Sequence, residues 1–215
     1  MASEEYYIGL MSGTSIDAID AVLVAFTADQ VSVRASYTRP VSTELRTAIL
    51  DLCLPGKDHL DLLGDTDRAL GMEFAAAAMA LLELSGLSAA QISAIGSHGQ
   101  TVRHRPCDSR PFTLQIGDPS TIAAATGIVT VADFRRKDIA LGGQGAPLVP
   151  AFHNAVFHDS QRNRVVMNIG GIGNITWLPA NGPVAGFDTG PGNGLMDAWI
   201  QRHRSLPYDR DGAWA

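Results

Sequence analysis

The segment Ile-Gly-Leu-Met-Ser-Gly-Thr-Ser-Ile-Asp-Ala-Ile-Asp, residues 8–20, places a glycine- and hydroxyl-rich turn between two apolar runs. The runs on either side, residues 6–12 and 18–27, have the composition and alternation of β-strands, and a third alternating run begins at Val31. Because the connections between these strands are short, the pattern predicts an antiparallel meander of three strands.

Helical patterns follow this meander and then alternate with further strands. Helices are expected at about 43–52, 60–84, 118–125, 146–158 and 190–202, and strands at 92–96, 127–132, 165–169, 174–178 and 184–187. Gly64 and Gly71 weaken the second helix and leave open a break inside it. No internal repeat is evident. A meander followed by alternating strands and helices predicts an α/β fold with a mixed sheet flanked by helices.

Composition limits the classes of function. The chain has 215 residues and a net charge of −6, which disfavours attraction to nucleic acid or to an anionic membrane. Its two cysteines, Cys53 and Cys107, have no metal-ligand spacing and provide no disulfide framework, so a reducing, cytoplasmic setting is expected. The apolar helical stretch at 74–82 is far shorter than the ~20 residues of a membrane span.

The turn at residues 13–20 has groups that suit a phosphate. Its backbone N–H groups and the hydroxyls of Thr14 and Ser15 can converge on an anion, and Asp17 and Asp20 follow closely. A carboxylate beside a phosphate indicates a hydrated Mg²⁺ between them. A capped hairpin turn without a ligand is the alternative. A P-loop is excluded because neither lysine is followed by Ser or Thr.

Two further segments combine polar side chains with glycines after a strand. Residues 96–105, Gly-Ser-His-Gly-Gln-Thr-Val-Arg-His-Arg, form either a polar site for a hydroxylated or anionic substrate or a solvated basic loop. In residues 132–147, Asp133 ends a strand and a basic cluster follows at 135–137. The glycines at 142–145 are expected to lead into a helix, as an anion cradle or as a plain flexible loop.

A second glycine turn lies at residues 168–176, Asn-Ile-Gly-Gly-Ile-Gly-Asn-Ile-Thr, again between two strands. It is not a dinucleotide fingerprint, because β-forming residues resume directly after the glycines instead of a helix. Asp188 follows at the junction of a strand and a helix, within a run of glycines. Its carboxylate suits a general base that activates a nucleophile, or it caps the helix.

Together these motifs resemble the anhydro-N-acetylmuramic acid kinase family of the sugar kinase/Hsp70/actin superfamily. The matching segments are Gly-Leu-Met-Ser-Gly-Thr-Ser-Ile-Asp at 9–17, Gly-Ser-His-Gly-Gln-Thr-Val at 96–102, Leu-Gln-Ile-Gly-Asp at 114–118, the run from Asp133 to Pro150, Asn-Ile-Gly-Gly-Ile-Gly-Asn at 168–174 and Gly-Phe-Asp-Thr-Gly-Pro-Gly-Asn at 186–193. They span nearly the whole chain in the family's order, which makes the set far more specific than any single glycine turn.

The resemblance implies a ribonuclease-H-like fold, one lobe of an actin-like ATPase, that binds ATP and Mg²⁺. Residues 1–215 would form the N-terminal lobe with both phosphate hairpins and part of the sugar site, and the C-terminal lobe of the family would be absent. The cofactor-binding residues that it implies are Gly13, Thr14, Ser15, Ile16, Asp17, Ala18, Ile19, Asp20, Gly170, Gly171 and Asn174, with Asp17 also at the metal. Ala18 departs from the family's glycine, which would cost about 1 kcal/mol if the position required a positive φ.

The reaction implied by the resemblance is ATP-dependent opening and O6 phosphorylation of 1,6-anhydro-N-acetylmuramic acid, in peptidoglycan recycling. Asp188 would be the catalytic base. The candidates for the sugar side, chosen by polarity and loop position, are His98, Gln100, Arg103, Asp133 and Arg135. The expected partners are the amino sugar and ATP, and the family suggests a homodimer. A non-catalytic sugar- or nucleotide-binding half-protein is the alternative; an actin-like scaffold would leave the polar segment at 96–105 without a task.

Overall fold

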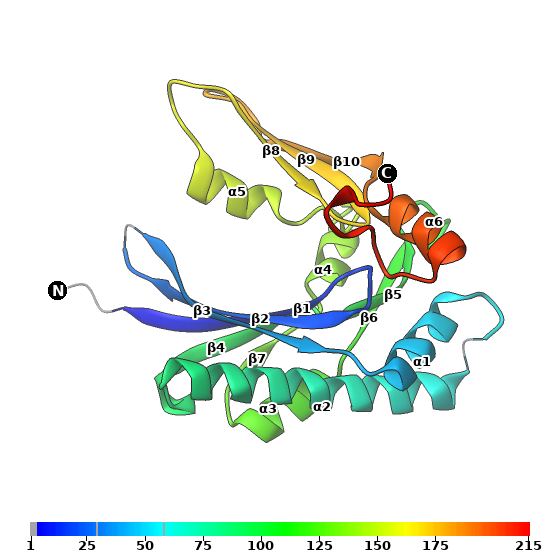
Figure 1. The fold of residues 1–215 in the computed structure, drawn as a ribbon. Helices are drawn as coiled ribbons and strands as arrows, with labels where there is room; N and C mark the ends of the chain where they lie inside the picture. Colours follow the sequence, from blue (N-terminus) through cyan, green and yellow to red (C-terminus); the bar gives the residue numbers. More distant parts are fainter. Residues whose placement is uncertain (1–3, 29, 58) are drawn as a thin grey trace. The chain divides into compact units, whose positions relative to one another are not determined.

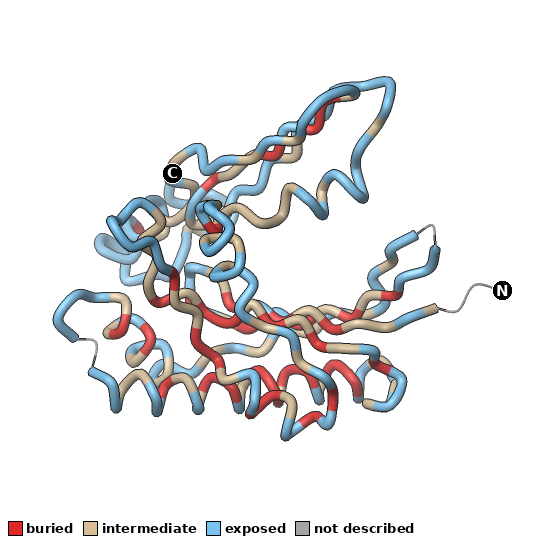
Figure 2. Tube along the Cα trace, turned by 180° about the vertical axis from the view of Figure 1, so that it is seen from behind, coloured by how far each residue is buried: buried red, intermediate tan, exposed pale blue. Residues whose placement is uncertain are grey.

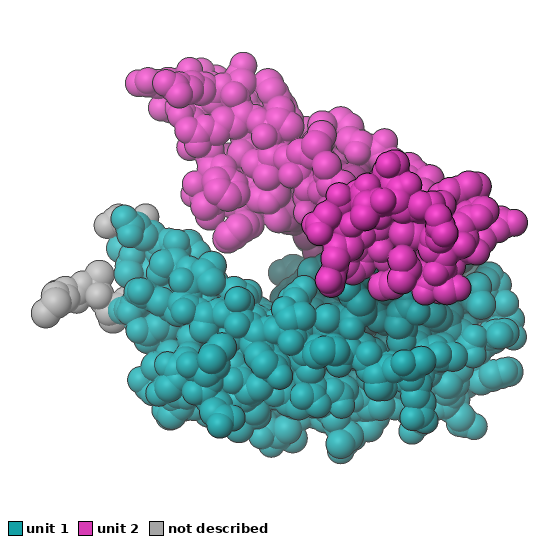
Figure 3. Space-filling model, in the orientation of Figure 1, with its two compact units in different colours: residues 1–145 teal, residues 146–215 magenta. Residues whose placement is uncertain are grey.

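The structure is a computed structural model that describes residues 4–28, 30–57 and 59–215. The chain forms two compact units, residues 1–145 and 146–215 (Figure 3). Each unit has its own sheet, and each is described by itself below. In the part of the chain that the structure describes, no helix combines the length and apolarity that crossing a membrane requires.

The first unit is built on a five-stranded mixed sheet (Figure 1). Its strands are β1 (Glu5–Ser12), β2 (Ala18–Phe26), β3 (Val31–Pro40), β4 (Ile92–Ser97) and β7 (Thr130–Val131), in the order β3-β2-β1-β4-β7. The first three strands pair antiparallel, whereas β4 runs parallel to β1 and to β7. This is the strand order of a ribonuclease-H-like sheet, so the predicted meander and the predicted mixed-sheet α/β fold are confirmed.

Helices flank this sheet. They are α1 (Thr43–Cys53), α2 (Leu60–Ser85), α3 (Pro119–Thr126) and α4 (Phe134–Ala140), with a short 3-10 turn at Ala89–Gln91. Ser42 caps α1 by accepting from the Leu45 N–H, and Asp118 caps α3 by accepting from Ser120 and Thr121. Short polar side chains at these two positions satisfy free N–H groups of the first turn of each helix.

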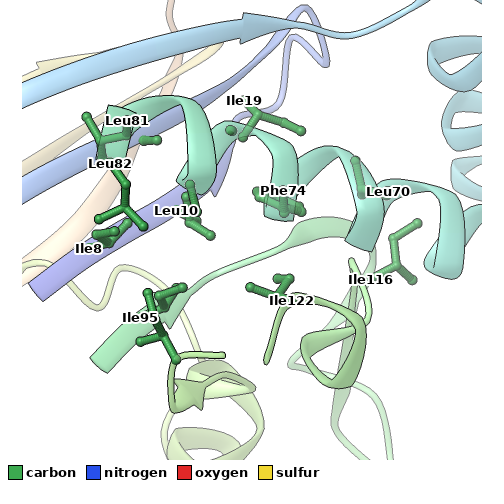
Figure 4. Packing of buried hydrophobic residues seen from close by; sticks show 14 of the residues in the cluster. Ile8, Leu10, Ile19, Leu70, Phe74, Leu81, Leu82, Ile95, Ile116 and Ile122 are labelled. Atoms are coloured by element: carbon green, nitrogen blue, oxygen red, sulfur yellow. The ribbon is translucent and has the colours of Figure 1, made fainter. Parts of the chain in front are cut away.

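The core of the first unit lies between α2 and the sheet. Alternate residues of β1, including Ile8 and Leu10, point toward α2, which is why the strand alternates between buried and partly exposed positions. Phe74 and Leu81 of α2 are fully buried there (Figure 4). Buried residues follow α2 and these strands in Figure 2. Removing this apolar surface from water is the main contribution to the stability of the unit.

Helix α2 runs without a break through both of its glycines and ends at Gly86, which adopts the left-handed φ of +70°. Gly71 is needed for packing, because a Cβ there would lie 2.9 Å from the backbone oxygen of Asp118. At Gly64 a Cβ would meet nothing within 4 Å. The close approach of α3, and not a bend in α2, therefore accounts for Gly71.

Two elements occur where the sequence predicts loops. Strands β5 (Gln100–Arg105) and β6 (Phe112–Ile116) form an antiparallel hairpin, and α4 begins directly after Asp133. Neither element shows the apolar periodicity from which strands and helices are predicted. Strand β5 is polar at five of its six positions, and α4 has only seven residues. The solvated-loop interpretation of 96–105 is therefore wrong for this segment.

The second unit contains a three-stranded antiparallel sheet in the order β10-β9-β8. Its elements are α5 (Pro150–Phe157), β8 (Arg164–Ile169), β9 (Ile172–Leu178), β10 (Ala185–Pro191) and α6 (Gly194–Arg204), followed by a 3-10 turn at Arg210–Gly212. Helices α5 and α6 begin four residues later than predicted. Like the first unit, this one contains a three-stranded meander whose first two strands are joined by a glycine turn, a structural repeat that the sequence does not reveal.

Candidate active site

The first glycine turn joins β1 to β2 and exposes its polar side chains. The Ile16 N–H donates to the Gly13 carbonyl at 3.2 Å, and Ile16 has a left-handed φ of +53°. This conformation places the Ile16 side chain in the core while Thr14, Ser15 and Asp17 remain exposed. The tip therefore presents two hydroxyls and a carboxylate to solvent, the combination expected of a phosphate and Mg²⁺ site.

The remaining predicted residues of this segment belong to strand β2. Ala18 begins the strand opposite Pro40 and has no positive φ, so alanine is accommodated without strain. The Ile19 side chain is fully buried in the core. Asp20 is exposed, and its carboxylate accepts a hydrogen bond from the Thr38 hydroxyl at 2.8 Å. The departure from the family's glycine at position 18 is therefore compatible with the turn.

Gln100 anchors the base of the same turn. Its side chain is buried, and its Oε1 accepts from the Ser12 hydroxyl at 2.6 Å. Its Nε2 donates to the Thr101 carbonyl at 3.2 Å, and the Ser12 N–H donates to the Gly99 carbonyl. The carboxamide thus joins the end of β1 to the start of β5. The structure gives Gln100 a role in holding the turn on the sheet.

His98 and Arg135 contact each other. Arg135 Nε donates to His98 Nε2 at 2.8 Å, and Arg135 Nη1 donates to the Gly145 carbonyl at 2.6 Å. Since Nε2 accepts this bond, the proton of the neutral ring lies on Nδ1, which is 2.9 Å from the Gly99 carbonyl. Burial lowers the pKa of His98 and the charge of Arg135 lowers it further, while the Gly99 carbonyl opposes both. His98 is therefore neutral at pH 7.

His98 and Asp133 line the same pocket of the first unit, whose volume is about 200 Å³. Asp133 adopts a left-handed φ of +64° before α4 and pairs with the Arg136 guanidinium at 3.2 Å. The full lining is Asp67, Ser97, His98, Gly99, Leu114, Gln115, Ile116, Gly117, Pro119, Ala132, Asp133 and Arg136. This pocket brings together residues that the sequence places in separate segments.

Three polar residues of the pocket were not predicted. The hydroxyl of Ser97 and Oε1 of Gln115 are buried without a hydrogen-bond partner in the described structure, so both are available to a ligand. The Asp67 carboxylate accepts from the Gly117 N–H at 2.6 Å, and burial raises the pKa of Asp67. Ser97 and Gln115 lie inside motifs quoted above, whereas nothing in the helical pattern around Asp67 points to a site.

Arg103 and the glycine loop at residues 142–145 do not line this pocket. Arg103 Nη2 donates to the Leu52 carbonyl at the end of α1, and Arg103 is not among the lining residues. In the loop, the Gly145 N–H donates to the Asp138 carboxylate at 2.7 Å, and the Gly143 N–H donates to the Asp138 carbonyl. These two N–H groups are therefore occupied by Asp138 of α4. Helix α5 begins only at Pro150, so the glycines do not stand at its first turn, and the predicted anion cradle at a helix start is wrong.

The second unit carries Asp188 in a polar row across its sheet. Asp188 of β10 lies opposite Asn174 of β9, which lies opposite Asn168 of β8. Directly opposed residues share one face of a sheet, so the three polar side chains are neighbours. Asp188 is exposed. The residue that caps α6 is Asn193, so the helix-cap interpretation of Asp188 is wrong.

The second glycine turn is held from outside by the segment that leads into α6. The N–H groups of Gly192 and Asn193 donate to the carbonyls of Gly171 and Gly170 at 2.9 and 2.8 Å. A side chain on Gly192 would collide with the Gly170 carbonyl. Glycine is therefore required for this contact, which keeps the turn and the end of β10 together. The predicted ligand-binding glycines of this turn remain a hypothesis.

Among the residues that the structure describes, no group of three or more His, Cys, Asp or Glu side chains could hold a metal ion. A magnesium ion that binds a nucleotide needs only one or two carboxylates, because phosphate oxygens and water supply its other ligands. The exposed carboxylate of Asp17 beside the first turn fits such a shared site.

The family model and the curated relatives that match this chain carry the same family name. The family model described as anhydro-N-acetylmuramic acid kinase matches residues 5–215. Proteins named anhydro-N-acetylmuramic acid kinase are 60% identical over 214 residues in Shewanella pealeana and 54% identical over 215 residues in Vibrio cholerae. The matches cover 99% and 100% of this chain, which spans 58% of the length of either relative.

Solved structures resemble the chain more distantly. A reductive activator for a corrinoid, iron-sulfur protein matches with a TM-score of 0.49 at 13% identity, over 87% of this chain and 31% of that one. The ethanolamine utilization protein EutJ from Carboxydothermus hydrogenoformans matches with a TM-score of 0.40 at 15% identity, over 97% and 60%.

Proposed function

The chain belongs to the anhydro-N-acetylmuramic acid kinase family, and from that premise we propose that it acts as an ATP-dependent kinase of 1,6-anhydro-N-acetylmuramic acid. The observation that carries the proposal is the exposed carboxylate of Asp188, beside Asn174 and next to the second glycine turn. An exposed carboxylate that caps no helix, on a sheet edge between two glycine-rich segments, suits a general base.

In the proposed reaction, Asp188 accepts a proton from a water molecule whose oxygen attacks the anomeric carbon of the sugar. The bond from that carbon to O6 breaks, and O6 attacks the γ-phosphorus of ATP in line. The products are N-acetylmuramic acid 6-phosphate and ADP, which suits a step of peptidoglycan recycling. The amide nitrogen of Asn174, on the neighbouring strand, can donate to the Asp188 carboxylate and orient it, and Asn168 on the next strand can in turn bond Asn174.

In the proposed enzyme, the first glycine turn binds the phosphates of ATP. The exposed hydroxyls of Thr14 and Ser15 can donate to phosphate oxygens, as can backbone N–H groups at the tip. When bound, Mg²⁺ would neutralise charge on the phosphates, and Asp17 is the residue that would hold it. Gln100 and Ser12 act indirectly, since their hydrogen bond fixes the base of the turn.

The pocket around His98 supplies the sugar side. Ligand pockets commonly enclose about 300 to 1,000 Å³, so the 200 Å³ here takes only part of an amino sugar. The oxygens of Ser97 and Gln115 can bond its hydroxyl or amide groups. Arg136 brings a guanidinium to the same wall, a group that suits the lactyl carboxylate of this substrate.

The test substitutes Asp188→Asn, which keeps the shape of the side chain but removes the proton acceptor. ATP-dependent phosphorylation of the anhydro sugar is expected to fall at least about 100-fold, the usual contribution of a general base. Binding of ADP, followed by isothermal titration, should stay unchanged. The matched control is Asp211→Asn, another exposed acid of the second unit. Near-normal turnover in the Asp188 variant would remove Asp188 from the mechanism.

The same titrations separate the kinase from a binding module. If the chain binds the anhydro sugar and ADP but transfers no phosphate, even when it is joined to the remaining length that its relatives carry, the non-catalytic alternative replaces the kinase. If the joined protein transfers phosphate and the 215-residue chain does not, the kinase activity belongs to the full-length protein.

A further inference from the structure

A basic side chain of α1 reaches the first glycine turn. The Nη2 group of Arg46 donates to the Ser15 carbonyl at 3.4 Å, although the two residues are 31 positions apart in the sequence. Both residues are exposed, so the contact lies at the tip of the turn. The guanidinium is therefore next to the hydroxyls of Thr14 and Ser15, the groups that bind phosphate in the proposed function.

Helix α1 is held beside this turn by contacts other than the Arg46 side chain. The Val41 N–H, just before the helix, donates to the Asp17 carbonyl at 2.9 Å. Further along α1, Ile49 and Leu52 are almost completely buried in the core of the first unit. The backbone at Arg46 is therefore fixed relative to the turn, and only its side chain has to become ordered when a ligand binds.

The turn itself brings no cation to a bound phosphate. The charged side chains of residues 8–20 are the carboxylates of Asp17 and Asp20, and the chain has no P-loop lysine. Positive groups close to a polyphosphate stabilise its charge when it is bound and during phosphoryl transfer. A cation for this site has to come from another element, and α1 contacts the turn through an arginine.

The Arg46 guanidinium has donors left for a ligand. A guanidinium carries five N–H donors, and the long bond to the Ser15 carbonyl uses one of them. No carboxylate of the described chain pairs with Arg46, whereas Arg39 pairs with Glu73 at 2.5 Å. The planar fork of an arginine matches two phosphate oxygens at once. Arg46 is therefore both placed and chemically suited to bind a phosphate group.

We propose that Arg46 is a phosphate-binding residue of this site, a cation that α1 supplies to the polyphosphate chain of the nucleotide. The inference rests on the proposed function, in which the first glycine turn binds the phosphates. One N–H group of Arg46 keeps its bond to the Ser15 carbonyl, and others donate to phosphate oxygens. The side chain thus fixes the tip of the turn and neutralises part of the ligand's charge.

The test is isothermal titration of the 215-residue chain with inorganic tripolyphosphate in the presence of Mg²⁺. This probe has the phosphate chain of ATP without the adenosine, so it reports on the phosphate site alone. Arg46→Gln removes the charge, and Arg46→Lys keeps it. The matched control is Arg110→Gln, at an exposed arginine in the loop between β5 and β6, because it changes the net charge equally. Circular dichroism melts check that each variant is folded.

Arg46→Gln is expected to raise the dissociation constant of tripolyphosphate at least about 10-fold, the effect of losing one hydrogen bond between charged groups. Arg46→Lys should keep most of the affinity, and Arg110→Gln should bind as the wild type does. At about 1 M salt, charges act over only about 3 Å. The difference between wild type and Arg46→Gln should therefore shrink, whereas loss of the Ser15 contact alone would not depend on salt.

Three results would overturn this inference and leave the proposed function standing. They are unchanged binding by Arg46→Gln, an equal loss in Arg110→Gln, and a loss that Arg46→Lys shares in full and that salt does not reduce. In the last case Arg46 only holds the turn. If the wild-type chain binds no tripolyphosphate, the phosphate role of the turn in the proposed function is wrong, and this inference fails with it.

Discussion

Arg135 determines which nitrogen of His98 carries the proton. A guanidinium can only donate, so the 2.8 Å contact from Arg135 Nε requires a lone pair on His98 Nε2. Protonating that nitrogen would remove the hydrogen bond and bring two cations into contact. The fold therefore favours the neutral ring, in the same direction as the burial that lowers the pKa of His98.

This predicts a pH dependence of stability. Because the pKa of folded His98 is below its usual 6.5, the unfolded chain binds the proton first, and stability falls as the pH drops below about 6.5. His98→Gln can keep both hydrogen bonds without titrating, so its melting temperature should decline less between about pH 7.5 and about pH 5.5. Asp67, whose pKa is raised, acts with the opposite sign in both proteins.

The control for this measurement is His158→Gln, since His158 is exposed. The difference in slope between wild type and His98→Gln isolates the buried ring, because every other titrating group is shared. Parallel slopes for wild type and His98→Gln would contradict the assigned proton position.

Sequence reasoning identified polar residues but not their contacts. It selected His98 and Asp133, which do share a pocket, from their positions after predicted strands. It also selected Gln100 and Arg103 on the same grounds, although one holds the base of the first turn and the other bonds Leu52. A side chain's polarity is local information, whereas its partner depends on tertiary packing that the sequence alone does not show.

At the scale of elements, α2 contains two glycines with opposite consequences. In an exposed helix position, replacing glycine with alanine stabilises by about 0.5–1 kcal/mol. Gly64 is such a position, with open space around it. At Gly71 the added methyl would press on the Asp118 backbone, which belongs to another element and cannot rotate away.

The prediction is that Gly64→Ala raises the free energy of unfolding by about 0.5–1 kcal/mol, whereas Gly71→Ala lowers it by about 1–3 kcal/mol. Urea unfolding followed by circular dichroism measures both, and the two variants serve as each other's control because they share a helix and a substitution. A stabilised Gly71→Ala variant would show that α3 does not depend on this close approach.

Element types were predictable where apolar residues repeat over a long stretch. The meander, α1 and α2 follow from alternation and from apolar residues on one helix side. The hairpin of β5 and β6 was not, because Arg103 and His104 place polar groups where an ordinary strand would show apolar alternation. The structural repeat was not predictable for a similar reason. The glycine turns of the two units match, but the residue directly before the first glycine is the polar Ser12 in one unit and the apolar Ile169 in the other.

At the scale of the whole molecule, the two units have unequal cores. The main hydrophobic cluster consists entirely of residues from the first unit. In the second unit, the buried hydrophobic residues are Leu178 and Ile200 within the described part of the chain. Buried apolar area sets stability, so the first unit should be the more stable one. The second should open first, since local stability follows local burial.

The last prediction follows from this inequality. Residues 1–145, produced alone, should fold and unfold cooperatively within about 5 °C of the main transition of the whole chain. Their end at Gly145 keeps the bonds of that residue to Arg135 and Asp138. Residues 146–215 alone are expected to lack a cooperative transition, because a chain of that size with few buried apolar residues is marginal. Scanning calorimetry of both fragments and the whole chain makes the comparison. An unfolded 1–145 fragment would contradict this prediction, because the large core would then be stable only with the second unit present.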